Sequence, residues 1–326
     1  MNFSLWCDYL EKDFINGDFA SMIKEGKISG ATTNPAIFKT AFESGAYSEQ
    51  IASLKGKKEA KKIYELLAMN DVKNAAFKLL TNYANGEDGF VSIEVRPELF
   101  DDEVGSLDEA KRIFNTIKMP NVMMKIPASE QGYYAMRELV KRGINVNATL
   151  VFSLEQAKEC LKAFEKGLKS YKKKFPNTKE PECVISVFVS RFDRELEESL
   201  KKAGLDHMKY GIYNATSIYY EIETYGLNNV RTLFASTGVK GGKASPDYYI
   251  KELAFERSIN TAPLDALKAT NSINVISPTS KEVIEEYFAK AAAAGINHEK
   301  VCAKLFSDGI SAFKEAYAQS INALQA

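Results

Sequence analysis

Short apolar runs recur along the chain, and longer stretches of helical character separate them. The runs are rich in β-branched and aromatic residues or alternate apolar with polar positions, which is typical of β-strands. We expect eight strands, at residues 4–10, 28–35, 90–95, 121–128, 144–152, 183–193, 230–238 and 272–278.

Helix-start chemistry follows several of these runs. Three pairs have the S/T-x-x-E/Q spacing of a capping box, in which two side chains cap the first turn of a helix: Ser106 with Glu109, Ser153 with Gln156 and Thr279 with Glu282. A strand, a short loop and a capped helix form the repeating unit of parallel α/β proteins.

Eight such units in 326 residues average about 41 residues each, which favours a closed (β/α)8 TIM barrel over two separate domains. We therefore expect one barrel domain over residues 1–326. An open doubly wound sheet is the main alternative. It is disfavoured because no GxGxxG follows the first strand, and because residues 238–244 lack the Walker spacing.

Two regions lie outside the eight units. Residues 41–85 are long and helical and are expected to form extra helices; their basic run at residues 55–58 is interpreted as a solvated face. The last helix is expected to pack on the barrel through an apolar stripe spaced by three and four residues: Phe306, Ile310, Phe313, Tyr317, Ile321 and Leu324.

Composition limits the classes of function. The 43 Lys and Arg residues balance 43 Asp and Glu residues, so no overall field attracts nucleic acid or anionic lipid. No apolar run approaches the ~18 residues of a membrane-spanning helix. The four cysteines form no CxxC pair and the two histidines no HExxH motif. We expect a cytoplasmic protein without a metal or a cofactor.

Alternation along the strands indicates which side chains enter the barrel. The apolar residues of VSIEV, VMMKIP and NVNATL should face the helices, with Leu150 among them. Six strands then offer polar groups toward one end of the lumen, and Phe188 shares the inward face of the sixth strand with Ser186. The polar candidates are Asp8, Asn34, Glu94, Lys125, Asn147, Thr149 and Ser186. Buried polar groups cost desolvation unless they pair or bind a ligand, which favours a site.

Each candidate also has a structural interpretation. Lys125 with Glu94 could be a buried ion pair, Asp8 could cap the following helix, and Asn34 before Pro35 could form a turn. Thr149 suits any strand, Ser186 could fill space and Phe188 could belong to the core. A purely structural explanation requires all of these interpretations to be true at once, for residues at the same end of the fold.

The chemistry available to this set depends on Lys125. Burial away from water disfavours an ammonium ion and favours the neutral amine that attacks carbonyl groups. A Schiff base beside a hydroxyl-bearing carbon acts as an electron sink. Cleavage of the adjacent carbon–carbon bond then leaves a stabilised enamine, which is class I aldol chemistry without a metal or cofactor.

Five segments closely resemble the motifs of the transaldolase family and occur in the family order: residues 31–35 (ATTNP), 91–95 (VSIEV), 124–128 (MKIPA), 147–153 (NATLVFS) and 186–191 (SVFVSR). The match extends from Trp6 to Gly238, about three quarters of the chain. The resemblance implies a (β/α)8 fold and transfer of a dihydroxyacetone unit from sedoheptulose 7-phosphate or fructose 6-phosphate to glyceraldehyde 3-phosphate or erythrose 4-phosphate, an exchange of the pentose phosphate pathway.

The resemblance also implies roles for individual residues. Lys125 would form the Schiff base, Glu94 and Thr149 would hold a water that shuttles protons, and Asp8 would act as general base and then acid. The dihydroxyacetone hydroxyls would be bound by Asn34 and Asn147, with Ser186 completing the polar wall. The phosphate site would use Arg191 and Ser236.

The chain departs from one branch of the family at the phosphate site. An arginine of that branch is replaced here by Gly238, and the next cation is Lys240. Lys240 could replace the arginine, as in the Ser-Thr-Gly-x-Lys branch, or could be a solvated loop residue.

Two other functions stay open. A fructose 6-phosphate aldolase would release free dihydroxyacetone. It is disfavoured by Phe188, where those relatives carry tyrosine, and by Glu94, where they lack an acidic residue. A non-catalytic sugar-phosphate-binding barrel would need no inward amine. A monomer and a homodimer fit the sequence equally.

Overall fold

The eight strands form a closed, parallel barrel in sequence order in the computed structural model, which describes residues 3–325. The predicted (β/α)8 fold is therefore confirmed. The strands are β1 Ser4–Cys7, β2 Gly30–Thr32, β3 Val91–Glu94, β4 Val122–Pro127, β5 Asn145–Val151, β6 Cys183–Phe188, β7 Val230–Ala235 and β8 Ile259–Ala262.

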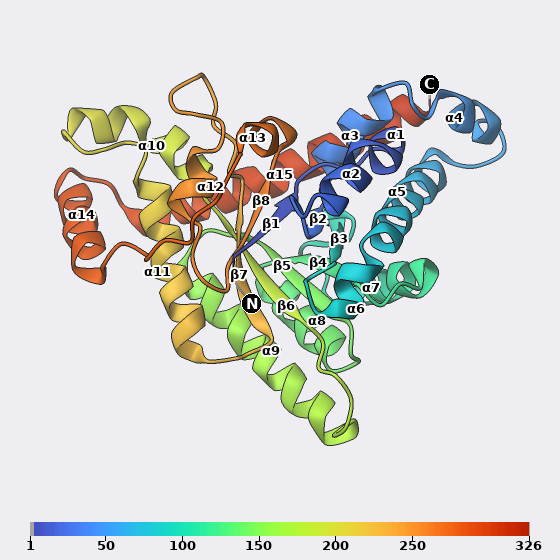
Figure 1. Ribbon diagram of the computed structural model, residues 1–326, viewed down its shortest axis with the longest axis horizontal. Coiled ribbons are helices and arrows are strands. Elements are labelled where there is room, and N and C mark those ends of the chain that lie inside the picture. Colours follow the sequence, from blue (N-terminus) through green and yellow to red (C-terminus); the bar gives the residue numbers. More distant parts are fainter. Residues whose placement is uncertain (1–2, 326) are drawn as a thin grey trace.

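Helices surround the barrel and follow its strands (Figure 1). They are α1 Lys12–Asn16, α2 Asp18–Lys24, α3 Pro35–Glu43, α4 Ser48–Leu54, α5 Ala60–Lys78, α6 Leu80–Asn85, α7 Glu103–Ile117, α8 Glu130–Val140, α9 Leu154–Lys174, α10 Ser190–Lys202, α11 Tyr210–Tyr225, α12 Tyr248–Glu252, α13 Leu264–Ala269, α14 Lys281–Ala293 and α15 His298–Gln325, with a 3-10 turn η1 at Pro97–Leu99. No helix within residues 3–325 is long and apolar enough to cross a membrane.

The prediction of the eighth strand was wrong. Residues 272–278 lie outside the sheet, and Val275 and Ile276 are 50% and 40% exposed. The strand that closes the barrel is β8, whose four residues alternate between the two faces. Ile259 packs in the barrel interior and Ala262 packs in the layer beneath the helices. Because β8 has only four residues, two apolar and two polar, its hydrophobic pattern is weak. Residues 272–278 carry a stronger pattern, which explains the wrong prediction.

One of the three predicted capping boxes is confirmed. Ser153 Oγ accepts from Gln156 N, and Gln156 Oε1 accepts from Ser153 N, at the start of α9. The other two were wrong. Helix α7 is capped instead by Asp102, which places Ser106 inside the helix. Helix α14 has Ser280 rather than Thr279 at its N-cap position.

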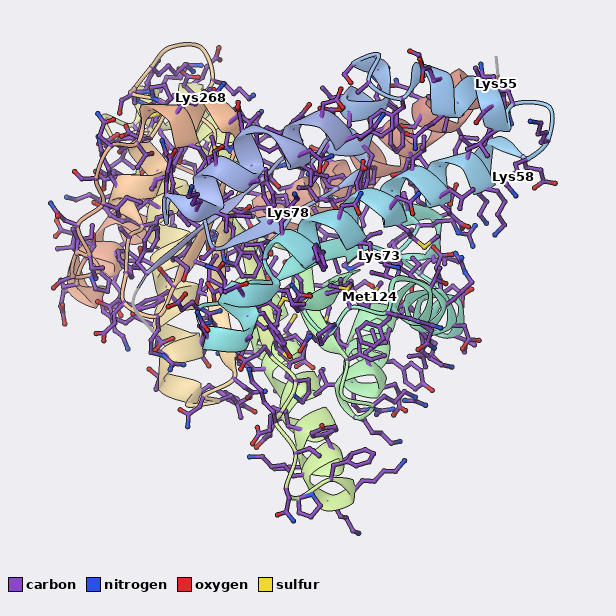
Figure 2. The ribbon with its side chains drawn as sticks, turned by 45° about the vertical axis from the view of Figure 1, so that its right-hand side comes forward. Lys55, Lys58, Lys73, Lys78, Met124 and Lys268 are labelled. Carbon is purple, nitrogen blue, oxygen red and sulfur yellow. The ribbon has the colours of Figure 1, made fainter. Side chains whose placement is uncertain are left out.

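The extra helices predicted between residues 41 and 85 are confirmed by α4, α5 and α6, which separate β2 from β3. Figure 2 shows Lys55 and Lys58 at the tip of the molecule formed by α4 and α5, whereas Met124 lies in the interior. Lys57 and Lys58 are exposed, as expected of a solvated face.

The predicted alternation holds along β3 and β4, where Val91, Ile93, Val122, Met124 and Ile126 pack beneath the helices. Leu150 departs from the prediction. The pairing of β5 with β6 shifts between Ala148 and Val151, and Leu150 has a φ of +56°. Leu150 therefore joins the cluster that connects barrel residues with α10, α14 and α15, and not the layer that holds Val146 and Ala148.

An ion pair closes the N-terminal end of the barrel. Trp6 fills the lumen so tightly that a Cβ on Gly30 would lie 2.5 Å from its ring. The indole Nε1 donates to Asp88 Oδ2 at 3.0 Å, and the other oxygen of Asp88 pairs with Arg231. Tightly packed side chains therefore fill the barrel at its N-terminal end.

Helix α15 covers the other end of the barrel. Its predicted apolar stripe is buried at Ile310, Phe313, Tyr317 and Leu324. The helix packs against α3, α5, α10 and β5. In Figure 1 it crosses the molecule from the side of α14 to the side of α4, where the C-terminus lies.

Candidate active site

A cavity of about 120 Å³ lies at the carboxyl ends of the strands. Its lining comes from six strands or the loops after them, and from helices α10 and α15. The residues are Asp8, Thr32, Asn34, Lys125, Ser186, Phe188, Arg191, Ala235, Ser236, Thr261 and Phe313. Seven of the predicted site residues therefore share one cavity, at the end of the barrel where enzymes of this architecture carry their chemistry.

Lys125 is a buried amine in the middle of β4, 4% exposed. Its Nζ donates to the carbonyl oxygen of Thr33 at 3.0 Å and lies 3.8 Å from Glu94 Oε2. The barrel register explains this contact, because Glu94 and Lys125 are partners on adjacent strands.

Glu94 lies beside the amine but lacks hydrogen bonds to the described residues. Both of its carboxylate oxygens are buried without a partner, and so is Thr149 Oγ1. Burial raises the pKa of Glu94 to about 7; the positive charge of Lys125 opposes this shift and the negative charge of Asp8 adds to it. A carboxyl group with such a pKa can give and take protons near neutral pH.

Asp8 follows β1 and faces the same cavity. Thr32 Oγ1 donates to Asp8 Oδ1 at 2.6 Å, and the hydroxyl of Thr261 lies 2.5 Å from that of Thr32. Burial raises the pKa of Asp8, whereas Lys125 and the hydrogen bond from Thr32 lower it. Asp8 does not cap the following helix, because Glu11 occupies the N-cap position of α1.

The amide side chains are held differently. Asn147 Nδ2 donates to Ser92 Oγ at 3.0 Å, and Ser186 Oγ donates to Asn147 Oδ1 at 2.6 Å, which fixes the orientation of the Asn147 amide. Asn34 caps α3 by accepting from Ile37 N at 3.0 Å, and it also lines the cavity. Asn34 can therefore cap the helix and belong to the site at the same time.

Arg191 forms the cationic end of the cavity. Its guanidinium carbon lies 5.1 Å from the centre of the Phe188 ring, and no hydrogen bond or ion pair joins its side chain to the described residues. Burial and the like charge of Arg194 lower the pKa of Arg191 to about 10, so it stays a cation at neutral pH. Nearby, Ser236 Oγ lies 3.1 Å from Ser190 Oγ, and Ser236 has a φ of +56°.

Lys240 lies apart from this set. It is exposed and lines a neighbouring cavity with Ser190, Arg194 and Lys243. The structure therefore brings Arg191 and Ser236 together with Lys125, but does not bring Lys240 into that cavity.

Four lining residues were not among the predicted site residues: Thr32, Ala235, Thr261 and Phe313. Inward parity in the second predicted strand could have found Thr32, whereas Thr261 lies in β8, which was not among the predicted strands. Phe313 was predicted only as part of the apolar stripe of the last helix. Residues 3–325 contain no group of three or more His, Cys, Asp or Glu side chains placed to share a metal ion.

Comparison with known proteins agrees with this geometry. Residues 5–324 match the family model described as transaldolase/fructose-6-phosphate aldolase. A protein named transaldolase from Campylobacter jejuni subsp. jejuni serotype O:23/36 is 46% identical over 330 residues, which cover 99% of each chain. A transaldolase from Helicobacter pylori strain P12 is 42% identical over 320 residues, 97% of each chain. The predicted resemblance is confirmed, and the chain belongs to the transaldolase/fructose-6-phosphate aldolase family of enzymes.

Proposed function

We propose that this chain is a transaldolase that moves a dihydroxyacetone unit from a ketose phosphate to an aldose phosphate through a Schiff base on Lys125. The donors are sedoheptulose 7-phosphate or fructose 6-phosphate, and the acceptors are glyceraldehyde 3-phosphate or erythrose 4-phosphate. The observation that carries the proposal is a buried amine that shares a cavity with a carboxylate and an unpaired guanidinium.

The first step is attack of the Lys125 amine on the donor ketone. The carbinolamine that forms loses water to give an iminium ion, and protons must move to and from its oxygen. Glu94 and Thr149 hold the water that carries these protons. Their buried oxygens without partners support this role, because such atoms are costly unless a water or ligand satisfies them.

Asp8 acts on the C4 hydroxyl of the donor. It removes that proton while the C3–C4 bond breaks, which releases the aldose phosphate and leaves the enamine on Lys125. The enamine then attacks the acceptor aldehyde, Asp8 returns the proton, and hydrolysis of the new iminium frees the amine. The hydrogen bond from Thr32 stabilises the ionised form of Asp8 before the proton is taken.

The remaining residues bind the sugar. Asn34, Asn147 and Ser186 hold the hydroxyls of the dihydroxyacetone unit so that the enamine keeps its position until the acceptor arrives. Phe188 provides the apolar wall beneath the guanidinium.

The phosphate group binds at the cationic end of the cavity. Arg191 and Ser236 bind its oxygens. Lys240 contributes only if its loop moves toward the cavity when phosphate binds.

Reduction with borohydride tests the Schiff base. Incubation with fructose 6-phosphate and borohydride should add a reduced three-carbon or six-carbon adduct to the peptide that contains Lys125, as seen by mass spectrometry. The Lys125→Met variant should show no adduct and no transfer while keeping its circular dichroism spectrum. An unmodified Lys125 peptide from an enzyme that turns over would refute the proposal.

The competing aldolase function is tested with the same substrates. With fructose 6-phosphate and erythrose 4-phosphate, a transaldolase makes sedoheptulose 7-phosphate and releases little free dihydroxyacetone. Release of dihydroxyacetone at the rate of fructose 6-phosphate consumption would favour the aldolase. A folded protein that binds sugar phosphate without turnover would favour the non-catalytic barrel.

Location and assembly remain predictions. The four cysteines are free and buried, which is consistent with a reducing cytoplasm. A monomer and a homodimer are distinguished by light scattering of the purified chain.

A further inference from the structure

Helix α15 comes closest to Arg191 at a glycine. A Cβ atom on Gly309 would lie 3.1 Å from Arg191 Nη1 and 2.9 Å from Leu150 Cδ2. Both distances are shorter than ordinary contacts of a Cβ atom, so a side chain at this position would have to displace the end of Leu150 and of Arg191. Gly309 lies well inside a helix of 28 residues, where glycine costs about 1 kcal/mol relative to alanine. This cost points to a steric reason for the glycine.

The arginine that meets Gly309 is held by packing. Its guanidinium lies over the ring of Phe188 on one side, and no carboxylate or carbonyl of the described residues binds it. The like charge of Arg194 and the carboxylates of Asp308 and Glu94 act on it through space, without an ion pair. The orientation of the guanidinium therefore depends on the shape of the space between Phe188 and α15.

The next turn of α15 reaches the cavity itself. Phe313 follows Gly309 by four residues and so lies on the same face of the helix. It is 4% exposed and lines the cavity with Lys125 and Arg191. The face of α15 that carries Gly309 is thus a wall of the active site.

We propose that Gly309 is a positioning residue for phosphate recognition. Its missing side chain leaves the slot in which the Arg191 guanidinium lies, with its N–H groups free to meet a sugar phosphate. This inference rests on the proposed function, in which Arg191 binds the phosphate. It adds that phosphate binding by Arg191 also requires a residue without a side chain on a helix about 120 residues further along the chain.

The test is the Gly309→Ala variant, matched by Ser311→Ala on the exposed side of the same helix. Gly309→Ala should raise the KM for fructose 6-phosphate about tenfold, the effect of weakening one charge-assisted hydrogen bond, with kcat within about twofold of wild type. The KM for dihydroxyacetone as an unphosphorylated donor should not change. Ser311→Ala should behave as wild type toward both donors.

Two further variants show whether the effect passes through Arg191. Gly309→Ala should add nothing to the KM of Arg191→Ala, because the group that it displaces is already absent. The double variant Gly309→Ala with Leu150→Ala removes the contact with Leu150 but keeps that with Arg191. It should keep the raised KM, and it serves as the test if Gly309→Ala alone does not fold.

Each outcome separates the two proposals. An unchanged KM for fructose 6-phosphate in the folded Gly309 variants, with a raised KM in Arg191→Ala, would overturn the role of Gly309 and leave the phosphate site intact. An equal rise for dihydroxyacetone would also overturn it, because the damage would then be general. An unchanged KM in Arg191→Ala would instead remove Arg191 from the phosphate site of the proposed function.

Discussion

Glu94 and Lys125 lie side by side without a hydrogen bond between them: Glu94 Oε2 is 3.8 Å from Lys125 Nζ. Both carboxylate oxygens are buried and lack partners among the described residues. A buried ion pair that served stability alone would need close contact and further hydrogen bonds to offset the desolvation of two charges. The two unpartnered oxygens can instead accept hydrogen bonds from a water or a reacting hydroxyl beside the amine.

Replacing this acid should slow turnover and change its pH dependence. Glu94→Gln keeps the size of the side chain but cannot exchange a proton, so kcat should fall by about 10²–10⁴. Because burial raises the pKa of Glu94 to about 7, the wild-type profile of kcat should bend near pH 7, and that bend should be absent in the variant. The measurement is kcat from pH 5 to 9. A bend that persists in Glu94→Gln would assign the titration to another group.

The same shift predicts how stability depends on pH. A carboxyl group whose pKa is higher in the folded than in the unfolded state is ionised first in the unfolded state. Glu94 therefore destabilises the fold increasingly as pH rises from about 4.5 to about 7. Glu94→Gln should raise the free energy of unfolding more at pH 8 than at pH 4.5, as measured by urea denaturation. An equal effect at both pH values would contradict the raised pKa.

Thr32 should lower the pKa of the Asp8 carboxyl group. Its hydroxyl donates to Asp8 Oδ1 at 2.6 Å and lowers the pKa of that carboxyl against the effect of burial. Thr32→Val removes the donor, so the pKa of Asp8 should rise and the ionised base should appear only at higher pH. We expect kcat to fall by about tenfold at the acidic end of the profile and less at the alkaline end. Thr32→Ser keeps a hydroxyl and should restore the wild-type profile; if it resembled Thr32→Val, the hydrogen bond would not be the cause.

Much of the barrel and its chemistry could be predicted because strands alternate with a fixed period of two. That rule is set by covalent geometry, so it placed Glu94, Lys125 and Ser186 inside the barrel without knowledge of the fold. It failed at Leu150, where a positive φ and a shifted register break the period. No local pattern of apolar residues encodes such an irregularity.

The remaining errors come from contacts that are distant in sequence. Strand β8 pairs with both β1 and β7, although its own four residues carry a weak apolar pattern. Residues 272–278 carry a stronger pattern but have no partner strand. Phe313 was predicted as packing because its stripe fits any surface helix. Its place in the cavity depends on the path of α15 across the barrel, which only the assembled structure determines.

The ion pair at the opposite end of the barrel should matter for stability and not for catalysis. Asp88 is 2% exposed, binds Trp6 Nε1 and pairs with Arg231, whose Nη1 is already buried without a partner. Asp88→Asn fits the local φ of +65°, which asparagine tolerates, but leaves the arginine charge uncompensated. The free energy of unfolding should fall by about 3–5 kcal/mol in urea denaturation. The exposed neighbour Glu87 provides the control, Glu87→Gln, which should change it by less than about 0.5 kcal/mol.

The folded fraction of Asp88→Asn should keep the wild-type kcat and KM at 20 °C or below, because Asp88 and Arg231 lie before or at the start of their strands, whereas the cavity that Lys125 lines lies at the carboxyl ends. Kinetic assays on protein shown by circular dichroism to be folded provide the measurement. A loss of kcat without a loss of stability would mean that the packing at the N-terminal end of the barrel controls the geometry of the cavity at the other end. The packing of Trp6 through the lumen would then be the path to examine, by pairing Asp88→Asn with Trp6→Phe in a double-mutant cycle.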